Sequence, residues 1–272
     1  MYVLGIESSC DETSAAIVRM DGETRQICSN IVASQIEIHR LYGGVVPEIA
    51  SRAHIEAASR ITYEALDVAG LKIEDIDCIA VTSHPGLIGA LLVGVNFAKS
   101  LAFAHNIPLV AVNHVKAHVA AAYLEYPTLS APFTALVVSG GHTSFYRVNT
   151  PTEFEEIGST RDDAAGEAFD KIGRVIGMPY PGGAALDRLS KEGDPAKYPL
   201  PLAIIKDHPY DFSFSGLKTA AVNLIHNAQQ KGEEVNKADL CAYAHGEYFA
   251  LGKRLGAFGF SAVKKKKKHT PR

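Results

Sequence analysis

The sequence has few cysteines and no long uninterrupted apolar run. Its four cysteines, Cys10, Cys28, Cys78 and Cys241, form no CxxC pair, which is typical of reduced thiols in a cytoplasmic protein. No basic segment or cleavage-like site opens the chain, so we expect no secretory signal and predict cytoplasmic localisation. The longest apolar stretch, residues 87–104, is interrupted by glycine, asparagine and lysine, so we predict no membrane partner.

Several catalytic and nucleotide-binding motifs are also absent. The chain has neither P-loop spacing nor GxGxxG, which argues against a Walker or Rossmann nucleotide site. It has neither HExxH nor GxSxG, so a familiar protease mechanism lacks support. What the chain does have is 47% hydrophobic and 21% charged residues over 272 positions, the composition of a soluble globular protein with a large core.

The formal charge of −3 hides an uneven distribution. Residues 253–272 contain eight Lys or Arg and no acid, so residues 1–252 have 19 basic against 30 acidic side chains, a formal charge of −11. Binding of a nucleic acid by this acidic body would require a local basic patch or a basic partner. The five consecutive lysines at 264–268 could contact phosphates, but a solvated chain end is the favoured interpretation.

Hydrophobic patterning predicts an α/β fold with two related halves. Strands followed by alternating helices and strands indicate an α/β layer, and a strand, glycine turn and strand recur after residue 133. We expect the first domain at 1–125, the second at 126–245 and a divergent tail at 246–272. The predicted strands are 3–6, 14–18, 25–33, 79–82, 109–112, 135–138 and 144–148; the predicted helices are 47–69, 87–105, 162–177, 181–189 and 215–229.

Two of these helices have a clear apolar face. On helix 47–69 we expect the core face to be formed by Ile49, Ala53, Ala57, Ile61, Ala65 and Val68. On helix 162–177 it consists of Ala165, Phe169, Ile172 and Ile176.

The histidine pair in NHVKAH, residues 113–118, is the strongest sign of chemistry. His114 and His118 are four residues apart, so one helical turn brings both imidazoles to the same face, where they can share a metal ion. A catalytic metal normally takes three protein ligands, so a third would have to come from elsewhere.

Two turns of small residues, 5–13 and 137–143, are candidates for binding phosphate. The glycines at 140 and 141 would let backbone N–H groups approach an anion, although an ordinary hairpin turn remains an alternative. Glu7, Asp11 and Glu12 could hold a metal or orient a reacting group, or Asp11 could simply cap local N–H groups. Asp170 could accept from ribose hydroxyls or pair with Arg174.

Eight ordered motifs between residue 1 and about residue 242 together resemble the bacterial tRNA N6-adenosine threonylcarbamoyltransferase family, formerly called O-sialoglycoprotein endopeptidases. They are GIESSCDET (5–13), GGVVPEIASRAH (43–54), HPGLIGALLVG (84–94), NHVKAH (113–118), LVVSGGHT (136–143), DDAAGEAFDKIGR (162–174), YPGG (180–183) and FSFSGLKT (212–219).

The resemblance implies an actin-like ATPase fold, with two domains around a nucleotide cleft. It also implies transfer of a threonylcarbamoyl group from threonylcarbamoyl-adenylate to N6 of adenosine 37 in tRNA. The implied partners are tRNA, a small inactive paralogue and an ATPase, and the implied cofactors are one Fe²⁺ or Zn²⁺ per subunit and Mg²⁺ with the nucleotide. By resemblance, His114 and His118 bind the metal, Asp11 and Glu12 are catalytic, and the adenylate is contacted by Val137, Val138, Ser139, Gly140, Gly141, Asp170, Gly183 and Asp187.

After about residue 242 the chain departs from the family pattern. It lacks the late Gly-Gly-Val-Ala-Ala-Asn-like segment and the late Asp that completes the metal site in the family. We therefore expect an incomplete second domain, a two-ligand metal site and weak or no transferase activity. Two alternatives remain, a metalloprotease-type endopeptidase and a non-catalytic nucleotide-binding scaffold.

Overall fold

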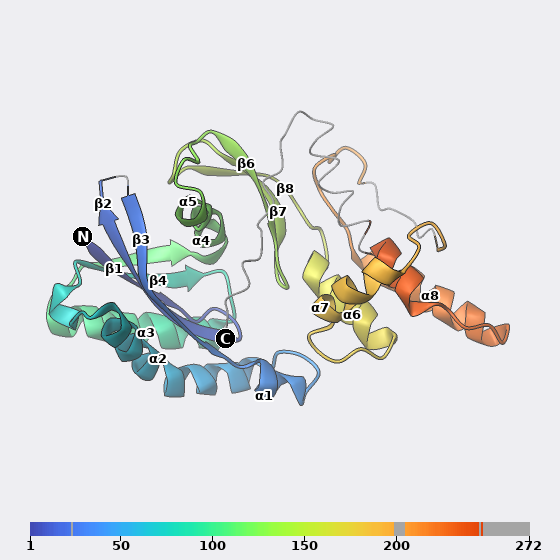
Figure 1. The fold of residues 1–272 in the computed structure, drawn as a ribbon, viewed down its shortest axis with the longest axis horizontal. Coiled ribbons are helices and arrows are strands. Elements are labelled where there is room, and N and C mark those ends of the chain that lie inside the picture. Colours follow the sequence, from blue (N-terminus) through green and yellow to red (C-terminus); the bar gives the residue numbers. More distant parts are fainter. Residues whose placement is uncertain (23, 199–204, 245, 247–272) are drawn as a thin grey trace. The chain divides into compact units, whose positions relative to one another are not determined.

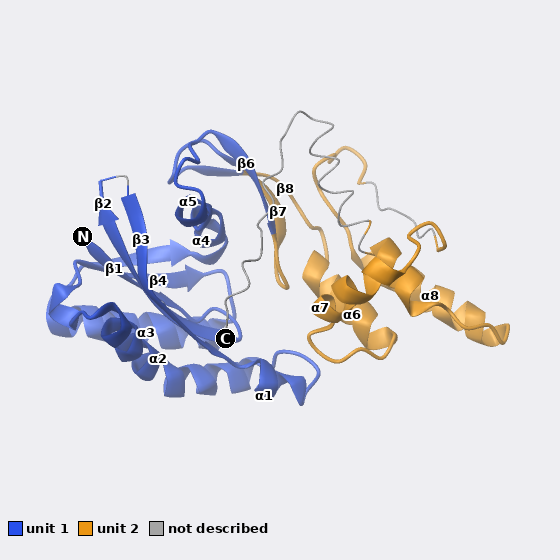
Figure 2. Cartoon of the chain, in the orientation of Figure 1, with its two compact units in different colours: residues 1–137, 147–155 blue, residues 138–146, 156–272 orange. Residues whose placement is uncertain are grey.

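The computed structural model describes residues 1–22, 24–198, 205–244 and 246. These residues form two compact units (Figure 2). Unit 1 comprises residues 1–137 and 147–155, and unit 2 comprises residues 138–146 and 156–272. The domain limits expected from the sequence stay predictions, and the tail at 246–272 lies outside the described residues except for position 246.

Unit 1 is built on a five-stranded sheet with the strand order β3-β2-β1-β4-β5 (Figure 1). β1 pairs antiparallel with β2, and β2 pairs antiparallel with β3, whereas β4 lies parallel to both β1 and β5. The carboxyl ends of β1, β4 and β5 therefore meet at one edge of the sheet. The strands are β1 (Tyr2–Glu7), β2 (Glu12–Asp21), β3 (Thr24–Ser34), β4 (Cys78–His84) and β5 (Leu109–Asn113).

Helices α2 and α3 lie side by side along this sheet (Figure 1). Pro47 at the first turn and Gly70, in the left-handed conformation with φ 68°, set the two ends of α2. The helices of unit 1 are α1 (Ile36–Arg40), α2 (Pro47–Ala69), α3 (Ile88–His105), α4 (His114–Ala120) and α5 (Ala122–Glu125), with a short 3-10 turn, η1, at Ile73–Asp75.

The core of unit 1 lies between the sheet and these two helices. It includes Leu4, Ile17, Ile61, Ile79 and Ala98, all almost fully buried. The predicted core face of α2 is confirmed at Ile61 and Ala65, but Ile49, Ala53 and Ala57 are only partly buried, so in that part of the helix the core face lies about one residue further along. The structure buries Ala50, His54, Ala58, Ile61, Thr62, Ala65 and Leu66, whereas Val68 is 60% exposed.

Helix α3 has the length and apolar composition that a membrane-spanning helix requires. In this structure, however, Ala98, Leu101 and Ala102 pack into the core of unit 1. One face of α3 therefore contributes to the core of this unit.

The second half of the chain begins with a three-stranded sheet, in the order β6-β7-β8, and continues with helices. Ile172, Leu186, Leu217 and Leu240 form the apolar core of unit 2. The elements are β6 (Phe133–Val138), β7 (Thr143–Val148), β8 (Phe154–Ser159), α6 (Ala165–Val175), α7 (Gly182–Leu189), η2 (Ser190–Glu192) and α8 (Ser215–Gln230). The predicted strand-turn-strand repeat is confirmed for β6 and β7, whereas β8 and α1 were not predicted.

Helices α6 and α7 approach each other at two glycines. A Cβ atom on Gly173 would lie 3.2 Å from the Cα atom of Gly182, and one on Gly182 would lie 3.3 Å from the Cα atom of Asp170. The backbones are thus close enough for Asp170 on α6 to reach the first turn of α7.

Candidate active site

The parallel strands of unit 1 bring three polar residues to one edge of the sheet. Glu7 is the last residue of β1, Thr82 lies near the end of β4, and His114 follows β5 directly. Carboxyl ends of parallel strands are the usual place for binding and catalytic groups in α/β folds. The topology therefore explains why Thr82 and His114 contact Glu7, although they lie 75 and 107 positions after it in the sequence.

Glu7 is the centre of this group. Its Oε2 accepts hydrogen bonds from Thr82 Oγ1 and His114 Nδ1, each at 2.8 Å, and its Oε1 accepts from the backbone N–H of Ser9. Burial alone would raise the pKa of Glu7, but the hydrogen bonds from His114, Ser9 and Thr82 outweigh it and lower the pKa to about 2. Glu7 is therefore ionised at neutral pH.

The two histidines of α4 point their Nε2 atoms at each other. Asn113 caps the helix by accepting from the backbone N–H of Lys116 at 3.0 Å, which starts α4 at His114. The Nε2 atoms of His114 and His118 are then 3.0 Å apart, with the rings nearly perpendicular at 81°. The predicted convergence of the two imidazoles is confirmed.

The separation of these two nitrogens is compatible with both histidines binding one metal ion. Two nitrogens bound to one tetrahedral metal at about 2.0–2.1 Å lie roughly 3.3 Å apart, close to the separation of these two atoms. His114 donates its Nδ1–H to a carboxylate, the arrangement that commonly orients a metal-binding histidine. Among the described residues, no group of three or more His, Cys, Asp or Glu side chains is placed to hold a metal.

The turn after β1 carries Asp11 and leads into Glu12, the first residue of β2, and donors from three separate segments hold its backbone. The carbonyl of Ser9 accepts from Leu87 N at 2.8 Å, that of Cys10 from His54 Nε2 at 2.9 Å, and that of Asp11 from Gln35 N at 3.0 Å. These donors belong to the starts of α3 and α1 and to the middle of α2.

Gly86 explains part of the HPGLIGALLVG motif. A Cβ atom there would lie 2.5 Å from the carbonyl oxygen of Ser9. Only glycine lets this segment pass so close to the turn.

A buried polar network lies beneath this turn, and the sequence analysis missed it. His54 accepts from Thr13 Oγ1 at 2.7 Å through Nδ1, while Gln35 Oε1 accepts from His39 Nε2 at 3.1 Å. Both histidines are 0% exposed, and Val46 N donates to His39 Nδ1 at 3.3 Å. Each neutral ring therefore carries its proton on Nε2. The available signal was a histidine on the largely apolar, core-facing side of an amphipathic helix.

In unit 2, the Ser139-Gly140-Gly141 turn joins β6 to β7. Ser139 Oγ accepts from the backbone N–H groups of Gly141 and His142 at 3.3 and 3.0 Å, and Gly166 N donates to the carbonyl of Ser139 at 3.2 Å. A Cβ atom on either Gly140 or Gly141 would meet nothing within 4 Å. The turn is therefore fixed internally, with open space beside its two glycines.

The other predicted nucleotide residues lie on α6 and α7. Asp170 Oδ1 accepts from the backbone N–H of Gly183 at 3.0 Å, so these two predicted residues are in contact. Asp187, one turn further along α7, pairs with Lys191 at 3.5 Å on the surface.

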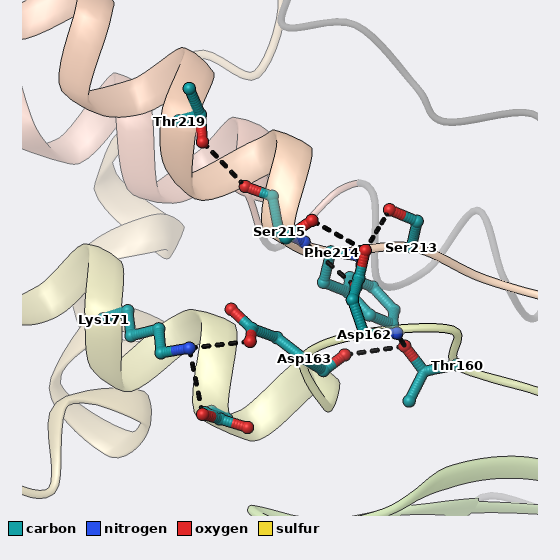
Figure 3. Close-up of polar contacts among 9 residues, drawn as sticks. Thr160, Asp162, Asp163, Lys171, Ser213, Phe214, Ser215 and Thr219 are labelled. Atoms are coloured by element: carbon teal, nitrogen blue, oxygen red, sulfur yellow. Dashed lines mark hydrogen bonds and ion pairs between the residues drawn. The ribbon is translucent and has the colours of Figure 1, made fainter.

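A group of hydrogen bonds centred on Asp162 joins the segment before α6 to the start of α8 (Figure 3). Asp162 accepts from Ser213 Oγ, Phe214 N, Ser215 N and Ser215 Oγ at 2.5–3.1 Å. Burial works against ionisation, but these hydrogen bonds prevail and lower its pKa. The cluster explains why the FSFSGLKT motif contains two serines.

Lys171 lies beside the same helix start. It pairs with Asp163 at 2.7 Å and with Glu167 at 2.9 Å. Hydrogen bonds from Lys171 to these carboxylates raise its pKa.

Comparison with known proteins identifies the family. Residues 26–252 match the family model described as TsaD, tRNA N6-adenosine threonylcarbamoyltransferase. Two curated proteins of that name, from Moorella thermoacetica and Clostridium botulinum, are 55% and 54% identical over 240 residues, covering 88% of this chain and 69% and 70% of their own lengths.

Solved structures give weaker similarities. YeaZ from Pseudomonas aeruginosa matches with a TM-score of 0.40 and 15% identity over 88% of this chain and 97% of its own. A PPX-GPPA enzyme from Aquifex aeolicus matches with a TM-score of 0.45 and 12% identity over 96% and 93%. The predicted α/β fold class is confirmed by the described sheets and helices.

Proposed function

Because this chain belongs to the tRNA N6-adenosine threonylcarbamoyltransferase family, we propose that it transfers a threonylcarbamoyl group from threonylcarbamoyl-adenylate to N6 of adenosine 37 in tRNAs that read codons beginning with A. The observation that carries this proposal is the match of residues 26–252 to the family model, together with 55% identity to a curated relative. The chain is thus an acyltransferase that acts on tRNA.

His114 and His118 are the proposed ligands of the metal on which this family generally depends, Fe²⁺ or Zn²⁺, one per subunit. The convergence of their Nε2 atoms and the anchoring of His114 by Glu7 support this assignment. A cation held there would polarise the carbonyl of the mixed anhydride and neutralise the departing phosphate.

The adenylate is the proposed ligand of the end of β6, the Ser139-Gly140-Gly141 turn and helices α6 and α7. The open space beside Gly140 and Gly141 supports close approach of a phosphate to backbone N–H groups, and Mg²⁺ would accompany the nucleotide. The proposed contacts are Val137, Val138, Ser139, Gly140, Gly141, Asp170, Gly183 and Asp187.

In the proposed reaction, N6 of adenosine attacks the carbamoyl carbon and the bond from that carbon to the phosphate oxygen breaks, releasing AMP. The attacking amine must lose a proton, which a carboxylate can accept. Asp11 and Glu12 are the proposed catalytic residues. The hydrogen bonds that hold the backbone of their turn support a fixed position for both.

The proposed partners are tRNA, the small inactive paralogue and the ATPase of the bacterial modification complex. Residues 1–252 have a formal charge of −11, which favours a basic partner or a local basic patch for tRNA phosphates.

Reconstitution tests the function directly. The chain, its two partner proteins, threonine, bicarbonate, ATP and tRNA unmodified at adenosine 37 are incubated, and the digested nucleosides are analysed by mass spectrometry. The same assay tests the sequence-based expectation of weak activity: we expect threonylcarbamoyladenosine to form slowly, and to be lost in His118→Ala but not in the matched control His226→Ala, an exposed residue on α8.

Two results would contradict the proposal. Metal-dependent peptide cleavage without modified adenosine would favour the protease alternative. Nucleotide binding with no product would favour a scaffold. Titration with Fe²⁺ or Zn²⁺ separately tests the expected two-ligand site, because tight one-to-one binding with a third protein ligand would contradict it.

A further inference from the structure

His54 is a fully buried histidine that the proposed reaction leaves without a role. It lies on α2 and is 0% exposed, although its neighbours on the same face, Ala50, Ala58 and Ile61, are apolar. A buried polar ring is costly unless both of its nitrogens are hydrogen-bonded. The shortest hydrogen bonds of this ring therefore indicate which part of the chain it holds.

The two shortest hydrogen bonds of His54 go to the turn that carries Asp11 and Glu12, while the Gln35 side-chain amide lies further away, 3.4 Å from Nδ1. Nε2 donates to the carbonyl of Cys10 at 2.9 Å, and Nδ1 accepts from Thr13 Oγ1 at 2.7 Å. Cys10 and Thr13 are the residues immediately before and after the two carboxylates. One rigid ring thus fixes both ends of a four-residue segment.

Two of the hydrogen bonds to this turn come from backbone N–H groups. Replacing a side chain does not remove these donors. Leu87 N binds the carbonyl of Ser9, and Gln35 N binds that of Asp11. Of the three donors to the consecutive carbonyls of Ser9, Cys10 and Asp11, His54 alone is a side chain. It is therefore the one that substitution can remove without moving a backbone segment.

We propose that His54 is a positioning residue for the transferase reaction, which holds the Asp11-Glu12 turn in its reactive geometry through simultaneous hydrogen bonds to Cys10 and Thr13. This inference rests on the proposed function only in assigning a catalytic role to the turn. His54 itself need not touch substrate, so it acts through the placement of the two carboxylates.

Three variants of the full chain test this role. His54→Met removes both hydrogen bonds and keeps an apolar side chain of similar volume. His54→Gln retains one amide donor and one amide acceptor. The matched control is Ile61→Val, which removes one methylene from the same helix in the same core and alters none of the turn's bonds.

The first readout is turnover in the reconstituted reaction. Misplacement of a catalytic group by about 1 Å costs on the order of 100-fold in rate, so we expect kcat of His54→Met to fall by about that factor. KM for tRNA should change less than about threefold, because uniform binding is retained. The kcat of His54→Gln should be at least about tenfold higher than that of His54→Met, and the kcat of Ile61→Val should equal that of the parent chain.

The second readout is amide hydrogen exchange of peptides covering residues 8–13, which does not depend on activity. We expect exchange in His54→Met to be at least about tenfold faster than in the parent and in Ile61→Val. If His54→Met does not fold, Thr13→Val removes one of the two bonds and carries the same test.

The outcomes separate this inference from the proposed function. Absence of modified adenosine with the parent chain would contradict the proposed function, while accelerated exchange would still support positioning of the turn. Unchanged exchange, or a kcat in His54→Met no lower than in Ile61→Val, would overturn the role of His54 even if the parent chain is fully active.

Discussion

Replacing Glu7 with glutamine tests whether this carboxylate orients His114, one of the two proposed metal ligands. Its Oε2 accepts two hydrogen bonds and its Oε1 accepts one. A glutamine amide has only one oxygen, so in one orientation its NH₂ group faces the N–H of Ser9, and in the other it faces Thr82 and His114. Either way, at least one donor loses its acceptor.

The magnitude follows from the charge of the lost acceptor. Hydrogen bonds to charged groups contribute about 1.5–3 kcal/mol each, so we expect the free energy of unfolding to fall by roughly that amount. Loss of a carboxylate that orients a metal-binding histidine typically costs 10–100-fold in metal affinity. That corresponds to about 1.4–2.7 kcal/mol of binding free energy.

Zn²⁺ titration followed by equilibrium dialysis, together with urea unfolding of the metal-free protein, measures both quantities. Glu48→Gln is the matched control, because Glu48 is an exposed partner of Arg52 whose side chain is 76% exposed. Surface pairs of this kind contribute about 0–1 kcal/mol. Zn²⁺ affinity of Glu7→Gln within twofold of the parent, with binding still lost in His118→Ala, would refute the assigned role of Glu7.

Three further predictions concern the rest of the chain. Gly86→Ala should lower the free energy of unfolding by about 1–3 kcal/mol, because the added methyl group would meet the carbonyl of Ser9. Gly216→Ala should not lower it, because a Cβ atom there meets nothing within 4 Å. Urea unfolding of both variants checks this contrast. Asp162→Ala should lower the free energy of unfolding by about 1–3 kcal/mol, because the backbone N–H groups of Phe214 and Ser215 at the start of α8 lose their acceptor. An unchanged thermal unfolding temperature would contradict that role. Burial lowers the pKa of His54 below 6.5, so below about pH 6.5 the unfolded chain binds a proton that the folded chain does not. The free energy of unfolding should therefore fall as the pH drops below about 6.5. Urea unfolding at pH 7.5 and 5.5 should show a smaller fall in His54→Gln than in the parent.

The long helices could be predicted because local signals mark their ends. Pro47 and Gly70 bound α2, and the prediction of 47–69 matches the structure. In contrast, β8 alternates apolar and charged residues only weakly over six positions, and α1 has only five residues. Short elements carry too little periodic signal to be recognised from sequence.

The site was only partly visible in the sequence. The spacing of His114 and His118 indicated a shared face, because one helical turn brings such residues together. The contacts of His54 could not be derived this way, since Cys10 is 44 positions distant and polar residues are usually assigned to the exposed face of a helix. That assignment also displaced the predicted core face of α2. The roles of the predicted site residues stay predictions.

The backbone contact between Gly173 and Gly182 has a consequence for how this chain can vary. A Cβ atom at either position would lie 3.2–3.4 Å from main-chain atoms of the other helix, so the two backbones would have to move apart slightly to accept it. Replacement of either glycine therefore puts strain on the hydrogen bond between Asp170 and Gly183, which depends on the close approach of the two helices.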